Sequence, residues 1–329
     1  PRSAPPPGSA AARRAPSGNT MIHLEPGHRV VGETIAARFN APADKREAVD
    51  VRAADFDDVQ YHVQVAPEDR NLMHIHVWVR NFKEIEEQVG EQYFQEVYPG
   101  MLAKPAAKGY SISLAVNLDT IPEDQTARDA LARKLSSMKR DVLGAPLWVC
   151  FGALSQGAQP PRSHYVISYR PEEAMYVIPQ GDLVVVVFTI AFENAVEQAI
   201  AKVFLQEIEV TRRAARELAT APSVNFTTEP PHELKTITSL TPKTGQHFIG
   251  FVSLAVSKRN VEGPGKLEKA VGLTEAYRAY LVFHVKAAKS QMHTRIRTRC
   301  SNWLQVLNRA MPEKLNTEKK TISGRTFKR

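Results

Sequence analysis

The C-terminal part of the chain carries a helical pattern that is longer than a compact domain is wide. No proline occurs from Lys266 to Met311, a span of 46 residues. A helix of that length measures about 70 Å at its usual rise of about 1.5 Å per residue. A compact domain of this chain's size is only about 30–40 Å across. We therefore predict a helix over about 266–311 that extends beyond its own domain. The alternative is a bend at Ser301-Asn302 that folds it back.

An apolar stripe continues along the far half of this predicted helix. At 3.6 residues per turn, its members project within about a third of the helix circumference. They are Val285, Ala288, Met292, Ile296, Trp303 and Leu307. Where the helix extends beyond its domain, the apolar stripe must be buried by another polypeptide. A partner helix is the simplest way to bury it. We predict that these six residues form an interface with a partner helix.

Positive charge is concentrated at the same end of the chain. Residues 286–329 contain twelve Lys or Arg and only two acids, Glu313 and Glu318, which gives +10. The first twenty residues add +3, and the whole chain carries +8, so residues 21–285 must carry −5. This asymmetry points to an acidic partner surface, whether protein, nucleic acid or lipid.

The candidate residues for that contact flank the apolar stripe. One flank carries Lys286, Lys289, His293 and Arg297, and the other carries Arg295, Arg299 and Arg309. A nucleic-acid-binding helix is the competing interpretation, because it also needs a basic surface. Such surfaces usually interleave aromatic side chains for base stacking. After Phe283 the only Phe, Trp or Tyr residues in the sequence are Trp303 and Phe327, and Trp303 lies on the apolar stripe. We therefore expect no nucleic-acid partner and keep this function as the alternative.

Composition bounds the class of protein. The chain has 329 residues, 43% of them hydrophobic, which is enough for two ordinary domains. Its longest apolar run, Leu183–Phe192, is ten residues long and rich in β-branched side chains. A membrane span needs about 18–20 apolar residues, so this run predicts a buried strand, and we expect no membrane partner. The chain has only two cysteines, Cys150 and Cys300, which favours a reducing, cytoplasmic compartment.

Both halves of the chain show the same order of elements, β-β-β-α-β-α. After a helix over 28–39, the first half predicts strands at 48–53, 59–65 and 72–79, a helix from 82 to 94, a strand at 110–118 and a helix at 126–143. The second half predicts strands at 164–169, 174–178 and 183–191, a helix at 195–213, a strand at 248–256 and the long helix. Successive short strands favour antiparallel sheets covered by helices on one face. We predict an α+β protein with two tandem α/β domains of like topology, mainly antiparallel sheets with helices, plus a long C-terminal helix.

Domain boundaries follow from changes in composition. Residues 1–20 are mostly Pro, Ala, Gly and Ser and cannot build a core, so we interpret them as a disordered extension or a gene-model artefact. The first domain is predicted at 21–151, and the second, which ends in the long helix, at 162–312. The linker between them is predicted at 152–161, and a basic tail at 313–329.

Two short motifs could carry chemistry. Gly263-Pro264-Gly265-Lys266 resembles the end of a phosphate-binding loop, but Asn260 stands where the first glycine belongs. Leu267 also replaces the hydroxyl residue that would bind magnesium, so a turn and a helix start are the better interpretation. The acidic segment Asp55-Phe56-Asp57-Asp58 lacks the glycine and the distal glutamate of a calcium loop, and it predicts a turn.

Three histidines could in principle bind zinc. His74 and His76 share one face of the strand at 72–79, and His62 is expected on its neighbour. No carboxylate or cysteine stands near them in the sequence, and polar residues are expected on the outer face of a sheet. With no nucleophile elbow or nucleotide fingerprint present, we predict no enzyme activity, no catalytic residue, no metal and no cofactor.

Several segments, in the right order, give the chain a family resemblance. The N-terminal and central ones are Ala54-Asp55-Phe56-Asp57, Met175-Tyr176-Val177, Lys202–Glu207 and Pro230–Lys235. The most specific ones lie at the end: His293–Arg297, Leu307–Ala310 and Lys320–Phe327. From Met21 to Arg329 the chain resembles the 34 kDa subunit (subunit 2) family of the actin-related protein 2/3 complex. The stretches 126–161 and 236–265 match that family poorly.

The resemblance implies a fold and a set of partners. It implies two tandem α/β domains and a long C-terminal helix that packs against its counterpart in the smaller, twenty-kilodalton subunit. It implies a cytoplasmic, seven-subunit complex of the actin cytoskeleton, which contains actin-related proteins two and three and nucleates a branch from the side of a mother actin filament. Subunit 2 and the twenty-kilodalton subunit supply much of the filament contact. No catalysis or nucleotide binding is implied for subunit 2.

Overall fold

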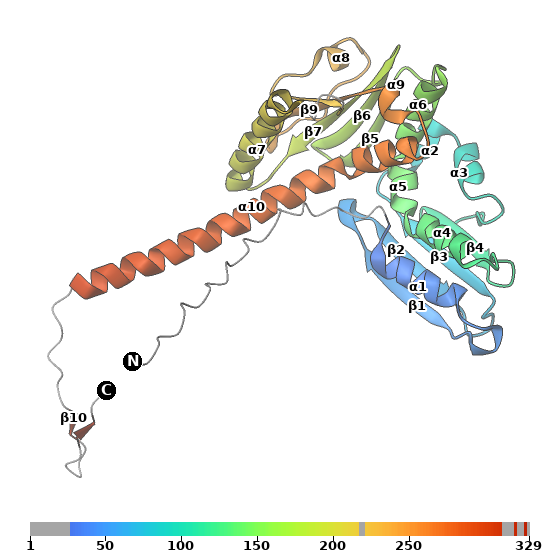
Figure 1. The fold of residues 1–329 in the computed structure, drawn as a ribbon. Coiled ribbons are helices and arrows are strands. Elements are labelled where there is room, and N and C mark those ends of the chain that lie inside the picture. Colours follow the sequence, from blue (N-terminus) through green and yellow to red (C-terminus); the bar gives the residue numbers. More distant parts are fainter. Residues whose placement is uncertain (1–26, 217–220, 311–318, 321–325, 328–329) are drawn as a thin grey trace, which may run out of the picture.

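Two antiparallel β-sheets and one long helix organise the computed structural model (Figure 1). The structure describes residues 27–216, 221–310, 319–320 and 326–327. The predicted N-terminal extension, 1–20, and most of the predicted basic tail, 313–329, lie outside these residues. The predicted α+β class is confirmed, and so is the antiparallel arrangement of both sheets.

The first sheet is a simple meander. Its four strands are, in order, β1 (Val49–Ala54), β2 (Gln60–Val65), β3 (Leu72–Trp78) and β4 (Ile112–Asn117). The alternation of β3 fixes which face is buried, because Met73, Ile75 and Val77 are all completely covered. Helix α1 (Arg29–Phe39) contributes every fourth residue to the same core. Short 3-10 helices, η1 (Ala43–Lys45) and η2 (Phe56–Asp58), flank β1.

The helices after the third and fourth strands are divided more finely than the sequence predicts. The helix predicted from 82 to 94 is two helices, α2 (Phe82–Val89) and α3 (Glu91–Val97). Gly90 separates them with φ 87°, a conformation that favours glycine. The helix predicted at 126–143 is likewise two, α4 (Gln125–Ser136) and α5 (Met138–Leu143).

The predicted linker at 152–161 is wrong in its first half. Helix α6 (Ala145–Gln156) continues through Gly152, and its Phe151 and Leu154 are buried in the core. Pro146 lies in the first turn of α6, where the missing N–H has no intrahelical partner to lose, so it is compatible with the start of this helix. Core packing on the apolar side of α6 outweighs the helix-weakening effect of Gly152.

The second sheet has five strands in the order β5-β6-β7-β9-β8. They are β5 (Tyr165–Arg170), β6 (Glu173–Gln180), β7 (Leu183–Ala191), β9 (Phe248–Ser257) and the edge strand β8 (Ser223–Thr227). Helix α7 (Ala195–Ala214) follows β7, and α9 (Lys258–Val261) follows β9. The like topology of the two halves therefore holds, with β8 and the short helix α8 (His232–Lys235) as an addition that the polar sequence around them did not predict.

The apolar run of β7 is explained by burial on both faces of the second sheet. Val184 and Val186 belong to the main core, whereas Val185 and Val187 belong to a smaller cluster on the opposite face. Leu234 of α8 covers that opposite face. The main core extends without interruption from the first sheet to the second, because α5 and α6 contribute to it between them.

The long helix, α10 (Lys266–Ala310), contains 45 residues without a break. The alternative of a bend at Ser301-Asn302 is therefore wrong. Helix α10 begins directly after Gly263 and Gly265, both of which have positive φ. This confirms the predicted turn and helix start. Figure 1 shows its first half against the body and its second half projecting away from it. The described residues end with a small antiparallel pair, β10 (Lys319–Lys320) and β11 (Thr326–Phe327). None of the described helices is long and apolar enough to cross a membrane.

Candidate functional site

The first half of α10, which we call the inner half (266–285), packs within the chain. Val271, Ala279 and Leu281 are buried, and Val285 has no exposed surface at all. Val285 belongs to the main core of the chain, so its prediction as a partner-helix residue is wrong. The helix stays in contact with its own body until about this position, and sequence periodicity cannot show where that contact ends.

A transition follows over the next two turns. Ala288 and Met292, both predicted for the partner interface, are partly buried. The Lys289 ammonium lies 2.9 Å from the Glu197 carboxylate of α7. Lys289 therefore already has a partner within the chain, which makes it a poorer candidate for an external acidic surface than the exposed Lys286.

The remainder of the helix, which we call the outer half (286–310), carries an exposed apolar surface. Ile296 is 49% exposed, Trp303 64% and Leu307 46%, as far as the described part of the chain can cover them. Leu304 and Val306 are also exposed and were missed by the sequence prediction. Val306 lies on the stripe, five turns after Ala288, whereas Leu304 lies about 60° beyond the edge of the stripe. The apolar surface thus becomes wider in the last two turns.

The outer half beyond Lys289 is also basic, with no acidic residue of its own to offset the charge. All four predicted arginines, Arg295, Arg297, Arg299 and Arg309, are exposed, as is His293. No Asp or Glu occurs in the sequence from Ala276 to Ala310. None of these arginines forms an ion pair with any residue that the structure describes. Such a surface can bind an apolar helix along the stripe and an acidic surface along its flanks.

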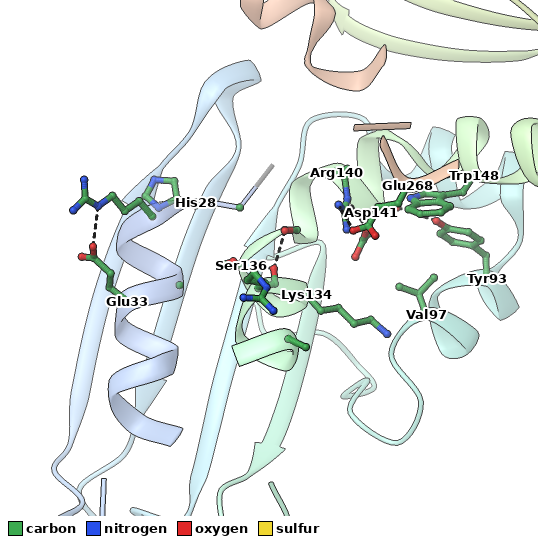
Figure 2. Close-up of a pocket in the computed structure, with 16 residues that line it drawn as sticks. His28, Glu33, Tyr93, Val97, Lys134, Ser136, Arg140, Asp141, Trp148 and Glu268 are labelled. Carbon is green, nitrogen blue, oxygen red and sulfur yellow. Dashed lines mark hydrogen bonds and ion pairs between the residues drawn. The ribbon is translucent and has the colours of Figure 1, made fainter. Parts of the chain in front are cut away.

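A cavity of about 1070 Å³ lies elsewhere, between α1, α3, α4, α5 and the start of α10 (Figure 2). Its carboxylates are held by neighbouring groups. Glu33 pairs with Arg29 at 2.8 Å, and Glu268 pairs with Arg140 at the same distance. Asp141 accepts a hydrogen bond from the Tyr98 hydroxyl at 2.9 Å, and burial raises the pKa of the Asp141 carboxyl. This arrangement stabilises the packing of α5 against its neighbours.

The three histidines considered for zinc lie together on the outer side of the first sheet, but the ring nitrogens of His62 and His76 have other partners. His62 contacts Asp50 at 2.9 Å and the Tyr110 hydroxyl at 3.0 Å, and His76 contacts Ser113 at 2.8 Å. Burial, followed by repulsion from His62 and His74, lowers the pKa of His76 to about 4. Among the described residues, no group of three or more His, Cys, Asp or Glu side chains could hold a metal ion.

The acidic segment Asp55-Phe56-Asp57-Asp58 forms the predicted turn. Its Asp57 carboxylate is nevertheless buried against cations from distant parts of the chain, among them Arg278 of α10. The sequence gives no signal for this contact, because the two residues are separated by more than 200 positions.

Comparison with known proteins identifies the family of the chain. Residues 75–314 match the family described as "Arp2/3 complex, 34 kD subunit p34-Arc". The chain is also 33% identical over 309 residues to actin-related protein 2/3 complex subunit 2 of Dictyostelium discoideum, which covers 94% of this chain and 99% of that protein. The chain belongs to the p34-Arc family. Actin-related protein 2/3 complex subunit 2 of Schizosaccharomyces pombe (strain 972 / ATCC 24843) is 30% identical over 327 residues, which covers 94% of this chain and all of that protein.

The p34-Arc match covers every residue that was predicted to bind a partner. It also spans the two stretches, 126–161 and 236–265, in which the family resemblance is weakest. Membership of the p34-Arc family supports a structural subunit and does not favour the nucleic-acid-binding alternative.

Proposed function

We propose that this chain is a non-catalytic, cytoplasmic subunit of the Arp2/3 complex whose α10 binds two partners. The apolar stripe of the outer half packs against a helix of the twenty-kilodalton subunit, and the arginine flanks contact the side of a mother actin filament. Actin-related proteins two and three occupy the same complex. The observation that carries the proposal is an exposed half-helix whose apolar residues and arginines have no partner in the described chain.

Covering the stripe supplies the larger part of the binding energy. Full burial of a Leu, Ile or Trp side chain stabilises by about 1.5–3 kcal/mol, and Ile296, Trp303 and Leu307 are about half exposed here. An exposed ion pair contributes only about 0–1 kcal/mol. Filament binding therefore requires several arginines that act together on one rigid helix.

The partner helix is tested by placing charge on the stripe. Ile296→Asp combined with Leu307→Asp should prevent co-purification with the twenty-kilodalton subunit, because two carboxylates would be buried without counterions. The matched control is Thr294→Asp with Thr298→Asp, which places the same charge on the opposite side of the helix, where both threonines are exposed. Recovery of the heterodimer with the stripe variant would refute this part of the proposal.

The filament contact is tested by charge reversal. Arg295, Arg297 and Arg299 changed together to Glu should leave the complex assembled but weaken its cosedimentation with actin filaments and its branching activity. Reversal of three exposed lysines on the body, Lys202, Lys235 and Lys258, changes the net charge equally and should have little effect. Unchanged cosedimentation of the arginine variant would show that the filament does not contact this surface.

A further inference from the structure

A buried ionic cluster connects α10 with both sheets. Arg278, on the inner half of α10, donates hydrogen bonds from Nη1 to Asp57 Oδ1 and from Nη2 to Glu173 Oε2. Its guanidinium also lies over the Tyr169 ring, 5.3 Å from the ring centroid. The Arg278, Asp57 and Glu173 side chains are each at most 6% exposed.

The two carboxylates come from different halves of the chain. Asp57 lies in the turn η2, between the first two strands of the first sheet, and Glu173 is the first residue of β6 in the second sheet. A single guanidinium of α10 therefore binds both sheets at once. Its planar fork fixes the direction of each contact, which a lysine ammonium cannot do.

Two further residues complete the group, which we call the junction cluster. The Lys139 ammonium of α5 lies 3.2 Å from Asp57 Oδ2 and 3.7 Å from Glu275 Oε1 of α10. Lys139 and Glu275 are also almost completely buried. The cluster thus contains three carboxylates and two cations.

The backbone of Asp57 adapts to this position. Asp57 has φ 64° and ψ 27°, a left-handed conformation that side-chain-bearing residues adopt only rarely. Aspartate tolerates it better than most residues, but such a conformation is maintained only when surrounding contacts determine it. The contacts to Arg278 and Lys139 are the ones that hold the Asp57 carboxylate at the centre of the junction.

We propose that the junction cluster sets the direction in which the outer half of α10 projects from the two sheets, with Arg278 as the positioning residue. Apolar contacts between α10 and α7 keep the helix on the body, but they are less directional than the paired hydrogen bonds of Arg278. From Arg278 to the end of α10 at Ala310 the helix is about 48 Å long, so a tilt of about 10° at the junction moves its tip sideways by about 8 Å. The consequence for branching rests on the proposed function, because it requires the outer half to contact the filament.

The direction of the helix can be measured in the full chain. Cys300 is exposed on the outer half and Cys150 is completely buried, so a spin label can be attached to Cys300 alone. A second label is introduced at Arg52→Cys in β1 or at Ser223→Cys in β8, both exposed positions. Arg278→Met should shift and broaden the distance distribution of both spin-label pairs. Arg278→Lys should have a smaller effect, because lysine keeps the positive charge but lacks the planar guanidinium that binds two carboxylates at once.

The matched control is Arg46→Met. Arg46 is a similarly buried arginine whose side chain pairs with Asp119 at 2.6 Å entirely within the first domain. Its loss should destabilise the chain without changing either distance distribution, so a general loss of stability is separated from a change in direction. Should Arg278→Met fail to fold, Glu173→Gln removes one carboxylate charge at nearly constant volume and should broaden the same distributions.

The outcomes separate this proposal from the proposed function. If the spin-label distances in the Arg278 and Glu173 variants match those of the unsubstituted chain, the positioning role is overturned. This result does not depend on whether the chain binds actin filaments. If the distances change, the same variants in the assembled complex should give a wider spread of branch angles by electron microscopy. Changed distances with unchanged branch angles would leave the junction cluster in place and count against filament contact through α10.

Discussion

At the scale of single residues, the junction cluster places charges where water cannot stabilise them. Taking a charge out of water costs several kcal/mol, so a buried ion pair is retained only where its geometry satisfies both partners. Arg278 meets that condition at its two terminal nitrogens, which each have a carboxylate oxygen as partner, whereas its buried Nε has no hydrogen-bond partner in the described chain. Glu275 meets it less well, because its Oε1 is buried without a hydrogen-bond partner in the described chain and its nearest cation, Lys139, is 3.7 Å away.

Glu275 should therefore make the stability of the chain depend on pH. Burial, partly opposed by Lys139 and reinforced by Asp57 and Asp55, raises the pKa of the Glu275 carboxyl to about 7. In the unfolded chain the Glu275 carboxyl has its ordinary pKa of 4.5. Between pH 4.5 and 7 the folded chain therefore binds one more proton than the unfolded chain. The contribution of Glu275 is then complete below pH 4.5 and is lost as the pH rises through 7, with a total on the order of 3 kcal/mol.

This prediction is measured as a difference between two proteins. The free energy of unfolding by urea is compared for the unsubstituted chain and Glu275→Gln at pH 5 and pH 8. Glutamine imitates the protonated carboxyl, so the variant should gain stability relative to the unsubstituted chain as the pH rises. Glu268→Gln, an exposed carboxylate on the same helix, is the control. Parallel pH dependences in all three proteins would show that Glu275 titrates normally.

At the scale of elements, the two halves of the single helix α10 have different sources of stability. The inner half is held by buried side chains such as Val271, Leu281 and Val285. From His293 to Arg309 every residue is exposed, so intrahelical hydrogen bonds and side-chain pairs alone support the outer half. Most of the stability of a helix in a protein comes from the packing of its apolar face, and the outer half has no such packing from His293 onward in the described chain. The proposed partner helix would therefore stabilise the outer half as well as bind it.

Hydrogen exchange should reveal this difference within one helix. In the isolated full chain, amide protons between residues 294 and 309 should exchange through local opening of a helix that stays mostly formed, whereas those between 271 and 285 should be protected nearly to the global limit. Binding of the twenty-kilodalton subunit should protect the first group without changing the second. Equal protection of both groups in the isolated chain would contradict the assignment of an unsupported outer half.

At the scale of the whole molecule, the two sheets share one core. Side chains of β3 and β7 belong to the same apolar cluster through the helices between them. Two domains with a common core are expected to unfold together, because neither can separate without exposing the apolar surface of the other.

Calorimetry can test this cooperativity. Ile75→Ala in the first sheet and Ile190→Ala in the second each remove a completely or almost completely buried side chain. Each should destabilise by about 2–5 kcal/mol, and both should lower the temperature of the same single transition. Two separate transitions, each sensitive to only one of the substitutions, would show that the halves fold independently.

The sequence by itself determined most of the local structure. The alternation of apolar and polar residues defined the buried face of β3. The apolar run Leu183–Phe192 identified β7, the strand that is buried on both faces. The absence of proline determined the length of α10, and periodicity placed its stripe and its arginine flanks. These features depend on neighbours within one or two turns, so the pattern of residues contains them. Gly152 shows the limit, because core packing on the apolar side of α6 decided that the helix continues through it.

Only the tertiary structure decided where α10 leaves the body and which of its residues remain free. Val285 and Ile296 lie on the same stripe, yet one is in the core and the other is in solvent. Lys289 and Arg297 were predicted on the same flank, yet only the lysine meets a carboxylate of α7. The contact of Asp57 with Arg278 likewise depends on how two distant segments pack. Helical periodicity gives the direction of a side chain around its axis, whereas burial depends on what the rest of the chain places there.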